Sequence, residues 1–314
     1  MTGRIFTCDH HVFDLPRPVA WTVVHTGSVP CDWYEMTVLY QPDMAPVLEK
    51  AAGFAAIEAG VTMLRGIVDE YEVRLGPEGV TASIHGRGYA ARLLDNESRP
   101  VTYQDATLAE IVRCHVTPYG ITCAETADLR AEQTYTVAAG CSQWKALDAF
   151  CQTYGGFSPR FTRDGKLLAA PPPPGRRLQA GEKDPVLSCS LREDHYGVLT
   201  EALVIDKTRN RSYSVKDPGE IARGGQCRRV LYTPGQDTWA AMRYTGAYQI
   251  QKSREEALAV ELRLPGSFPA FPGDVLEVSL PRMGLEGAFR VAEVENTFTA
   301  AGGALAAVTM KERV

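Results

Sequence analysis

The stretch Val61–Cys123, VTMLRGIVDEYEVRLGPEGVTASIHGRGYAARLLDNESRPVTYQDATLAEIVRCHVTPYGITC, carries the strongest fold signal in this chain. Two strand-like runs, Met63 to Leu75 and Val80 to His85, flank the tetrapeptide Gly76-Pro77-Glu78-Gly79. That tetrapeptide predicts a hairpin turn, because proline fixes its own φ and glycine tolerates a positive φ. The stretch therefore begins as a β-hairpin.

Helical signals follow the hairpin. After His85-Gly86-Arg87-Gly88-Tyr89 we expect a short helix over Ala90 to Leu94. Apolar residues then recur at helical spacing over Leu108 to Val116, and Gly120 follows as a stop signal. The order is thus strand, turn, strand, glycine-rich phrase and amphipathic helix.

Length and composition set the class of protein. The 314 residues are enough for two or three domains. Hydrophobic residues make up 45% and charged residues 23%, as in ordinary globular proteins. The net charge of −5 argues against a broad nucleic-acid-binding surface, so we expect no nucleic-acid specificity.

Membrane and disulfide signals are weak. No apolar run approaches the roughly 20 residues that span a bilayer. The N-terminus lacks the apolar core of a signal peptide, so we expect folding in the cytoplasm. The eight cysteines show no CxxC spacing and are predicted to be buried free thiols. They lie at positions 8, 31, 114, 123, 141, 151, 189 and 227.

The first predicted domain, residues 1–98, is mostly β. Apolar alternation over residues 19–40 predicts two strands around a Thr26-Gly27-Ser28 turn. Leu48 to Phe54 is compatible with a short helical turn, although Gly53 disfavours it. The hairpin over Val61 to His85 completes this unit.

The second predicted domain, residues 99–175, is a compact α+β unit. Its second helix is expected over Ser142 to Tyr154, with Ser142 as N-cap and Gly155-Gly156 as the stop. A hairpin is expected around Arg163-Asp164-Gly165-Lys166. The four prolines Pro171–Pro174 exclude helix and internal strand, so they mark the boundary.

The third predicted domain, residues 176–314, returns to β structure with one helix over Thr238 to Lys252. The polar, glycine-rich Tyr213 to Gly225 is predicted to be an exposed loop. The fold class is therefore α+β, mainly β, with an α+β insert between two β units. Strands are expected over residues 186–191, 197–205, 226–232, 257–264, 275–280, 288–298 and 304–311.

Two short motifs resemble ligand sites. Cys8-Asp9-His10-His11 is the densest metal-like cluster, but adjacent histidines on an extended segment point to opposite faces. We interpret it as part of a polar N-terminal arm. His85-Gly86-Arg87-Gly88 lacks the Lys-Ser/Thr step of a phosphate loop, so its glycines are predicted to let a strand end and bend.

No catalytic arrangement is predicted elsewhere. Cys151 could be paired with His115 or His195, but it lies on the apolar side of a predicted helix, where a thiol is inert. We therefore predict no catalytic, cofactor-binding or metal-binding residues and no cofactor. Carboxylates of one strand are read as a solvated or interface face, and helical aromatics as core. The carboxylates are Asp69, Glu70 and Glu72, and the aromatics are Trp144, Phe150 and Tyr154. Leu147 and Cys151 are expected in the same core as Trp144 and Phe150.

The order of these segments resembles a known family. LRGIVDEYEVRLGPEGVTASIHGRGYAARLLD (64–95) and TLAEIVRCHVTPYGI (107–121) resemble a strand pair, a glycine phrase and a helix of hub proteins at the base of phage tails. SQWKALDAFCQTYGGFSPRFTRDGKLLAAPP (142–172) and the final strands (272–312) continue the pattern. The chain resembles the gene D late-control and Mu-type baseplate hub family, which is akin to the N-terminal part of type VI secretion spike proteins.

The resemblance implies a structural role. Family members look like homotrimers whose subunits each carry two tube-like β-barrels, here within residues 1–98 and 176–314. Such a ring adapts a hexameric tail tube to a trimeric central spike, in contact with tape-measure or baseplate wedge proteins. A virion or phage-like particle baseplate is the implied location, and no enzymatic activity is expected. Alternatives from other classes are a tail-associated cell-wall hydrolase and a β-rich adhesion module.

Overall fold

Strands dominate the backbone, so the prediction of a mainly β, α+β chain is confirmed. The computed structural model describes residues 1–27, 32–77, 79–131, 134–181, 185–233 and 238–314. Ser28 and Glu78 of the two predicted turns, and Cys31, lie outside these ranges.

The first β unit is built from two four-stranded layers. One has the order β2-β1-β5-β6 and the other the order β3-β4-β8-β7. Their inner side chains share one core, in which the rings of Tyr34 and Phe54 stack at 3.8 Å between centroids. The elements are β1 (Thr2–Thr7), β2 (Val12–Asp14), β3 (Pro18–Thr26), β4 (Trp33–Leu39), η1 (Pro42–Met44), α1 (Ala45–Leu48), β5 (Ala51–Glu58), β6 (Val61–Ile67), β7 (Glu70–Gly76) and β8 (Gly79–Arg87).

Three local predictions for this unit were wrong. The expected arm around Cys8 is only the turn after β1, a strand that pairs with β5 and buries Ile5. The expected helical turn over Leu48 to Phe54 is instead the end of α1 followed by β5. The run Met63 to Leu75 is interrupted at residues 68–69, between β6 and β7. In each case pairing with a distant strand overrides the local signal.

The glycine phrase bends less than predicted, because β8 continues through Gly86 to Arg87. Gly86 is needed for close packing. A Cβ at this position would lie 2.6 Å from the hydroxyl oxygen of Tyr34 and still closer to the carbonyl oxygen of Ile67. That oxygen also accepts a 3.1 Å hydrogen bond from Tyr34.

We therefore expect Gly86→Ala to lower the free energy of unfolding by about 1–3 kcal/mol, the usual cost of overpacking. Urea denaturation followed by tryptophan fluorescence measures this change. Gly76→Ala is the matched control, because a Cβ at Gly76 would have no neighbour within 4 Å among the described residues. Equal effects of the two substitutions would contradict the packing argument.

The middle unit confirms its predicted helices and core. Thr107 and Ser142 each accept a backbone N–H at the start of α3 and α4. Trp144, Leu147 and Cys151 are buried on one face of α4, as their spacing predicted. The elements are α2 (Ala91–Leu94), β9 (Val101–Tyr103), α3 (Leu108–His115), η2 (Thr117–Tyr119), β10 (Cys123–Thr126), β11 (Tyr135–Val137), α4 (Gln143–Gly155), β12 (Arg160–Phe161) and β13 (Leu167–Ala169).

The last β unit has the strand order β15-β19-β22-β21; β20 pairs with the first half of β21, and β14 pairs with β20. Phe289 and Leu262 lie in its core. Its elements are β14 (Arg177–Gly181), β15 (Ser188–Glu193), β19 (Leu258–Pro265), β20 (Val275–Leu280), η3 (Pro281–Met283), β21 (Leu285–Thr299) and β22 (Gly303–Arg313).

A separate α/β layer is inserted between β15 and β19. Its sheet has the order β17-β16-β18, and α6 packs on it. The prediction of a loop over Tyr213 to Gly225 was wrong, because that stretch includes most of β17 and all of α5. The elements are β16 (Glu201–Asp206), β17 (Arg211–Lys216), α5 (Pro218–Ala222), β18 (Arg228–Tyr232) and α6 (Trp239–Ala257).

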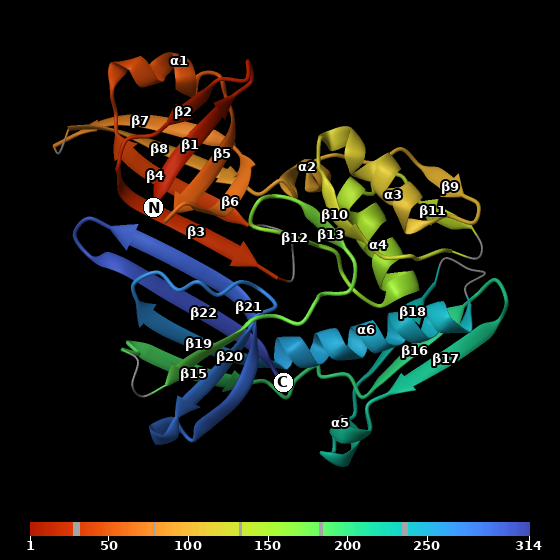
Figure 1. Ribbon diagram of the computed structural model, residues 1–314. Helices are drawn as coiled ribbons and strands as arrows, with labels where there is room; N and C mark the ends of the chain where they lie inside the picture. The colour runs from red at the N-terminus through yellow and green to blue at the C-terminus, as the bar shows by residue number, and fades with distance from the viewer. Residues whose placement is uncertain (28–31, 78, 132–133, 182–184, 234–237) are drawn as a thin grey trace.

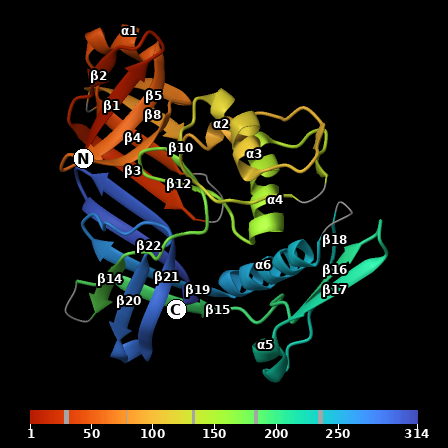
Figure 2. The same cartoon turned by 45° about the vertical axis from the view of Figure 1, so that its right-hand side comes forward.

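The two β units lie one above the other, and the helical parts lie beside them (Figure 1). Figure 2 shows the same two-column arrangement after a 45° turn. The α4 and α6 helices are in contact, and Tyr248 of α6 lies 2.9 Å from the Ser158 hydroxyl. Among the described residues, no helix has both the length and the apolar character required to cross a bilayer. The domain boundaries at 98 and 175 remain predictions.

Candidate assembly interface

One continuous sheet passes through both β units. Its strand order is β15-β19-β22-β21-β3-β4-β8-β7, so the first and last parts of the chain meet at β21 and β3. These two strands pair antiparallel over seven residue pairs, from Glu293 with Thr26 to Thr299 with Ala20. The long β21 thus belongs to the last unit and also completes the edge of the first.

The β21–β3 junction is buried on its core face. Trp21 lies opposite Phe298, with their rings stacked at 6.1 Å between centroids. Val23 lies opposite Asn296, and both are buried. At this junction β21 of the last β unit pairs with the edge strand β3 of the first, and their core-face side chains pack together.

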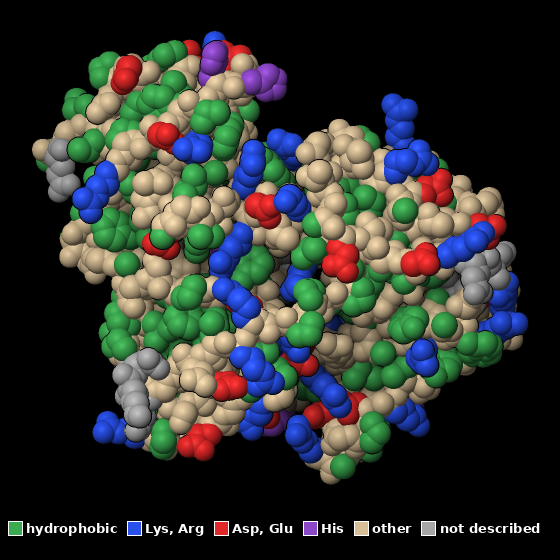
Figure 3. All heavy atoms as spheres, in the orientation of Figure 1, with side chains coloured by type: hydrophobic (Ala, Val, Ile, Leu, Met, Phe, Trp, Pro, Cys, Tyr) green, Lys and Arg blue, Asp and Glu red, His purple; other side chains and the backbone are tan. Residues whose placement is uncertain are grey.

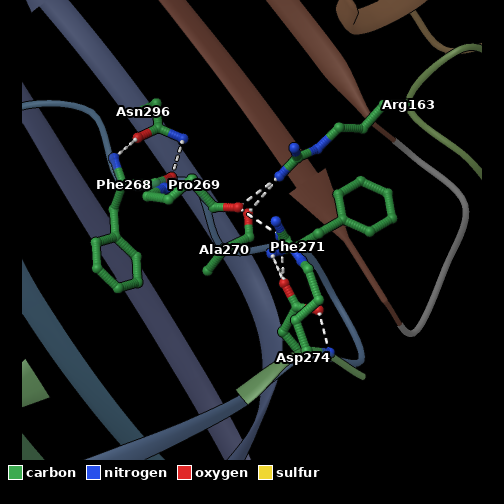
Figure 4. Close-up of polar contacts among 8 residues, drawn as sticks. Arg163, Phe268, Pro269, Ala270, Phe271, Asp274 and Asn296 are labelled. Carbon is green, nitrogen blue, oxygen red and sulfur yellow. Dashed lines mark hydrogen bonds and ion pairs between the residues drawn. The ribbon is translucent and has the colours of Figure 1, made fainter. Parts of the chain in front are cut away.

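A loop over residues 266–274 braces this junction, as Figure 4 shows. The Asn296 side chain accepts a hydrogen bond from the Phe268 N–H (2.8 Å) and donates one to the Phe268 carbonyl (3.3 Å). The guanidinium of Arg163, from the middle unit, donates to the carbonyls of Pro269 and Ala270 at 2.8 and 3.0 Å. The loop thereby ties the last β unit to the middle unit.

Asp274 holds the base of this loop. Its buried carboxylate accepts hydrogen bonds from the backbone N–H groups of Phe271 (2.9 Å) and Arg176 (3.0 Å). It also pairs with the Arg176 guanidinium at 2.6 Å. Arg176 follows the four prolines, so Asp274 fixes the segment that enters the last β unit.

Asp274→Ala is expected to lower the free energy of unfolding by about 1–3 kcal/mol, because it leaves the backbone N–H groups of Phe271 and Arg176 without their acceptor. Urea denaturation of the full chain measures the loss. Glu277→Ala is the control, since Glu277 pairs with Arg177 at 2.9 Å on the exposed surface of the same region, where ion pairs contribute little to stability. A loss at Asp274 no larger than at Glu277 would contradict this assignment.

The two β units repeat the same strand connectivity. The order β3-β4-β8-β7 in the first unit corresponds to β15-β19-β22-β21 in the last, and every neighbouring pair is antiparallel. In both units one more strand pairs with the first part of the long strand: β5 pairs with β6 in the first unit, and β20 pairs with the first half of β21 in the last. The break between β6 and β7 corresponds to the bulge in β21 after Arg290.

The correspondence extends to single residues. With hairpin β7–β8 matched to β21–β22 by register, the buried positions of β8 coincide with those of β22. Ala82 and Ile84 of β8 match the buried Ala306 and Val308 of β22. The registers then match three buried residues of β4 to three of β19. These are Tyr34, Met36 and Val38, and Val260, Leu262 and Leu264.

Two differences separate the units. The β14 strand pairs parallel with β20, whereas β1 pairs antiparallel with β5. The residues between β15 and β19 form the inserted α/β layer, whereas a short connection joins β3 to β4. The shared part is therefore the sheet β3-β4-β8-β7 and its counterpart, together with the added strand, β5 in the first unit and β20 in the last.

Both ends of the continuous sheet carry exposed apolar side chains. On β7, Val73 is 42% and Leu75 79% exposed, and Tyr71 is exposed beside them. On β15, Leu191 is 44% exposed. Val73 and Leu191 lie opposite the buried Ala82 and Val260, so they are on the core face of the sheet. The sequence predicted strands over both segments, at Met63 to Leu75 and at 186–191, but it did not indicate that they are the end strands of one sheet.

The metal-like cluster of the N-terminus is engaged in a turn. Asp9 pairs with Lys50 at 2.8 Å and accepts a hydrogen bond from Thr7. These contacts lower the pKa of Asp9 to about 2. Within the described ranges, no group of three or more His, Cys, Asp or Glu side chains is placed to hold a metal ion.

The residues considered for catalysis have separate environments. His115 is buried, with Nδ1 2.6 Å from the Gln143 Oε1 and Nε2 2.9 Å from the Tyr103 hydroxyl. Burial lowers the pKa of His115 and raises that of the Cys151 thiol. No hydrogen bond joins Cys151 to His115 or to the exposed His195 in the described part of the chain. The seven described cysteines are free, but only Cys151 is fully buried.

Two of the three carboxylates predicted on one strand pair with arginines, and Asp69 lies in the break between β6 and β7. Arg87 binds Asp69 at 2.8 Å and Asp95 at 2.7 Å, and Glu72 pairs with Arg74 at 3.0 Å on β7. Glu70 is exposed on the same strand. These contacts fit the interpretation of a solvated or interface face.

A basic hollow separates the first β unit from the middle unit. Arg65, Arg160 and Arg163 line it, and Figure 3 shows Lys and Arg side chains gathered along the middle of this face. Burial lowers the pKa of Arg160 and Arg163. Arg163 donates to the loop carbonyls and lies over the Phe271 ring, so its guanidinium has a structural role in holding the loop.

Comparison with solved structures identifies the fold. The structure superposes on a 43 kDa tail protein of prophage MuSo2 from Shewanella oneidensis with a TM-score of 0.80 and 15% identity, covering 99% of this chain and 98% of that one. A tail protein from Neisseria meningitidis MC58 gives a TM-score of 0.79 and 15% identity, with coverage of 99% and 95%. The chain thus has the fold of these tail proteins.

A more distant likeness extends to secretion systems. An Escherichia coli component of the type VI secretion system, described as structurally similar to bacteriophage T4 tail proteins, matches with a TM-score of 0.58 and 10% identity. The match covers 95% of this chain and 74% of that one. No protein-family model and no curated protein matches this sequence.

Proposed function

We propose that this chain is the baseplate hub of a phage or phage-like tail, a homotrimeric ring that joins the hexameric tail tube to the trimeric central spike. Tube and spike are its main partners, and tape-measure and baseplate wedge proteins lie close by. The hub assembles in the bacterial cytoplasm and is part of the finished particle. Its role is mechanical.

The internal repeat is the observation that carries this proposal. Two units with the same strand connectivity stand in one chain, joined edge to edge through β3 and β21. Three copies would present six such units in a ring, which matches a sixfold partner on one side while the chain itself keeps threefold symmetry. The likeness to tail proteins over nearly the whole chain supports the same role.

The mass of the assembly tests the proposal. Light scattering of the purified full chain, alone and mixed with the spike protein of the same particle, is expected to give about three times 34.3 kDa per ring. Electron microscopy of that species should show a ring with six lobes. A monomer under both conditions would overturn the hub assignment.

An activity assay separates the hydrolase alternative. The same preparation is expected to leave a peptidoglycan suspension turbid, with lysozyme as the positive control. If a monomeric chain clears the suspension, the enzyme is favoured over the hub.

A further inference from the structure

We infer that β15 of one copy pairs antiparallel with β7 of the next copy, in the register that β3 and β21 use within the chain. The two open ends of the sheet thereby become one more junction of the same kind. This inference rests on the proposed ring and names the strands and residues that close it.

The unpaired ends of the sheet are equivalent to the strands that already pair. The β15 strand corresponds to β3, and β7 corresponds to the second half of β21. Within one chain β3 is covered by β21, whereas β15 and β7 are the terminal strands of the path. Exposed apolar edge strands are templates for pairing with another chain.

The register follows from the matched positions. Trp21 and Val23 of β3 correspond to Cys189 and Leu191 of β15. Phe298 and Asn296 of β21 correspond to Leu75 and Val73 of β7. Each residue pair between β3 and β21 therefore predicts one pair between β15 and β7.

Two predicted pairs then stand on the core face. Trp21 faces Phe298 inside the chain, so Cys189 should face Leu75 of the next copy. Val23 faces Asn296, so Leu191 should face Val73. Apolar side chains thus meet at both positions.

The opposite face is complementary in charge. In this register Arg192 of β15 stands opposite Glu72 of β7, and Ser190 stands opposite Arg74. Opposite charges on directly opposed residues stabilise an antiparallel pair. A shift by one residue would set Leu191 against a charged side chain and turn the apolar positions to the other face.

The chain also limits the length of the pairing. Beyond Glu193 and Tyr71, the next pair would set Asp194 opposite Glu70. Two carboxylates directly opposite each other disfavour pairing, so we expect the ladder to end at Tyr71. At the other end Ser188 meets Gly76, beside the hairpin turn.

Such a contact is head to tail, so it forms a closed ring only if successive copies are related by a rotation that returns to the first copy. A different strand is used on each partner, so every copy offers β15 to one neighbour and β7 to the other. If three copies close the ring, each unit has the same kind of sheet edge on both sides. The inserted α/β layer follows β15, so it would lie beside each new junction.

A single substitution makes the register visible. Leu75→Cys places a thiol opposite the native Cys189 of the next copy, and directly opposed residues lie close enough for a disulfide. Mild oxidation of the full chain should link L75C chains into dimers and trimers on a non-reducing gel, at least tenfold more than the unsubstituted protein. Leu75 is 79% exposed, so the variant is expected to fold.

Matched variants control for other cysteines and for register. Val73→Cys should give no linkage, because Leu191 and not a cysteine stands opposite it. L75C combined with Cys189→Ser should lose the linkage, and V73C with Leu191→Cys and Cys189→Ser should regain it. A second readout needs no cysteine. Glu72→Arg and Arg192→Glu should each weaken assembly in light scattering, and the double variant should restore it.

The outcomes separate this inference from the proposed function. A trimer that forms in every variant, with L75C linked no more than V73C, would overturn the β15–β7 pairing and leave the hub intact. A chain that stays monomeric with and without the spike and shows no linkage would overturn both. Linkage of L75C that depends on Cys189, together with rescue by the charge swap, supports the pairing.

Discussion

Val73→Lys is expected to leave the chain folded but monomeric. Val73 is on the core face of β7, and it is 42% exposed because no other described strand of the chain pairs with that edge. A lysine there remains hydrated in the monomer, but pairing with β15 of another copy would bury its charge opposite Leu191. We estimate a cost of about 3 kcal/mol per junction, or roughly a hundredfold in the association constant.

Sedimentation velocity over a range of protein concentrations measures this effect. The unsubstituted chain should sediment as a trimer and the V73K chain as a 34.3 kDa monomer. Once both chains are diluted until they are monomeric, their urea midpoints should be equal. Val12→Lys is the control, because Val12 is an exposed valine on β2 at the edge of the other sheet. Loss of assembly in V12K, or its retention in V73K, would count against the edge as the contact.

Trp144→Ala should give the largest loss of stability. Trp144 is in the first turn of α4, is 8% exposed, and lies 6.2 Å from the ring of Phe161. Truncation would leave a cavity in the core of the middle unit, which typically costs about 3–5 kcal/mol. Because α4 contacts α6, this loss should also loosen the inserted α/β layer.

Chemical denaturation followed by circular dichroism is the measurement, since the substitution removes one fluorophore. Trp239→Ala is a close control, because Trp239 is also in the first turn of a helix but is 51% exposed. Its loss should change the free energy of unfolding by less than about 1 kcal/mol. If the two substitutions cost the same, burial of the Trp144 ring is not what stabilises the middle unit.

The two predictions separate assembly from folding. Val73→Lys changes a surface that is apolar but uncovered in the single chain, so the expected effect appears only between copies. Trp144→Ala changes a buried ring far from the open strands, so its expected effect appears in the single chain. If both results are obtained, the single chain is stable by itself and the copies can dissociate without unfolding.

The sequence determined the elements whose signals are local. The helix over residues 143–155 follows from a serine cap, one apolar face and a glycine stop, all within one stretch of chain. The strand at Val275–Leu280 was predicted with its observed bounds, because an apolar run between turn residues identifies it. The mainly β class and the core role of Trp144, Leu147, Phe150 and Cys151 follow from the same kind of signal.

Only the tertiary structure decided which strands meet. The sequence predicted an arm around Cys8 and a helical turn over Leu48 to Phe54, because the strands at Thr2–Thr7 and Ala51–Glu58 are defined by their pairing with each other. The junction between β3 and β21 joins residues more than 260 positions apart, and no local pattern encodes such a contact. The open edges of β7 and β15 are defined by the same long-range order, since an apolar strand is an edge only when no other strand covers it.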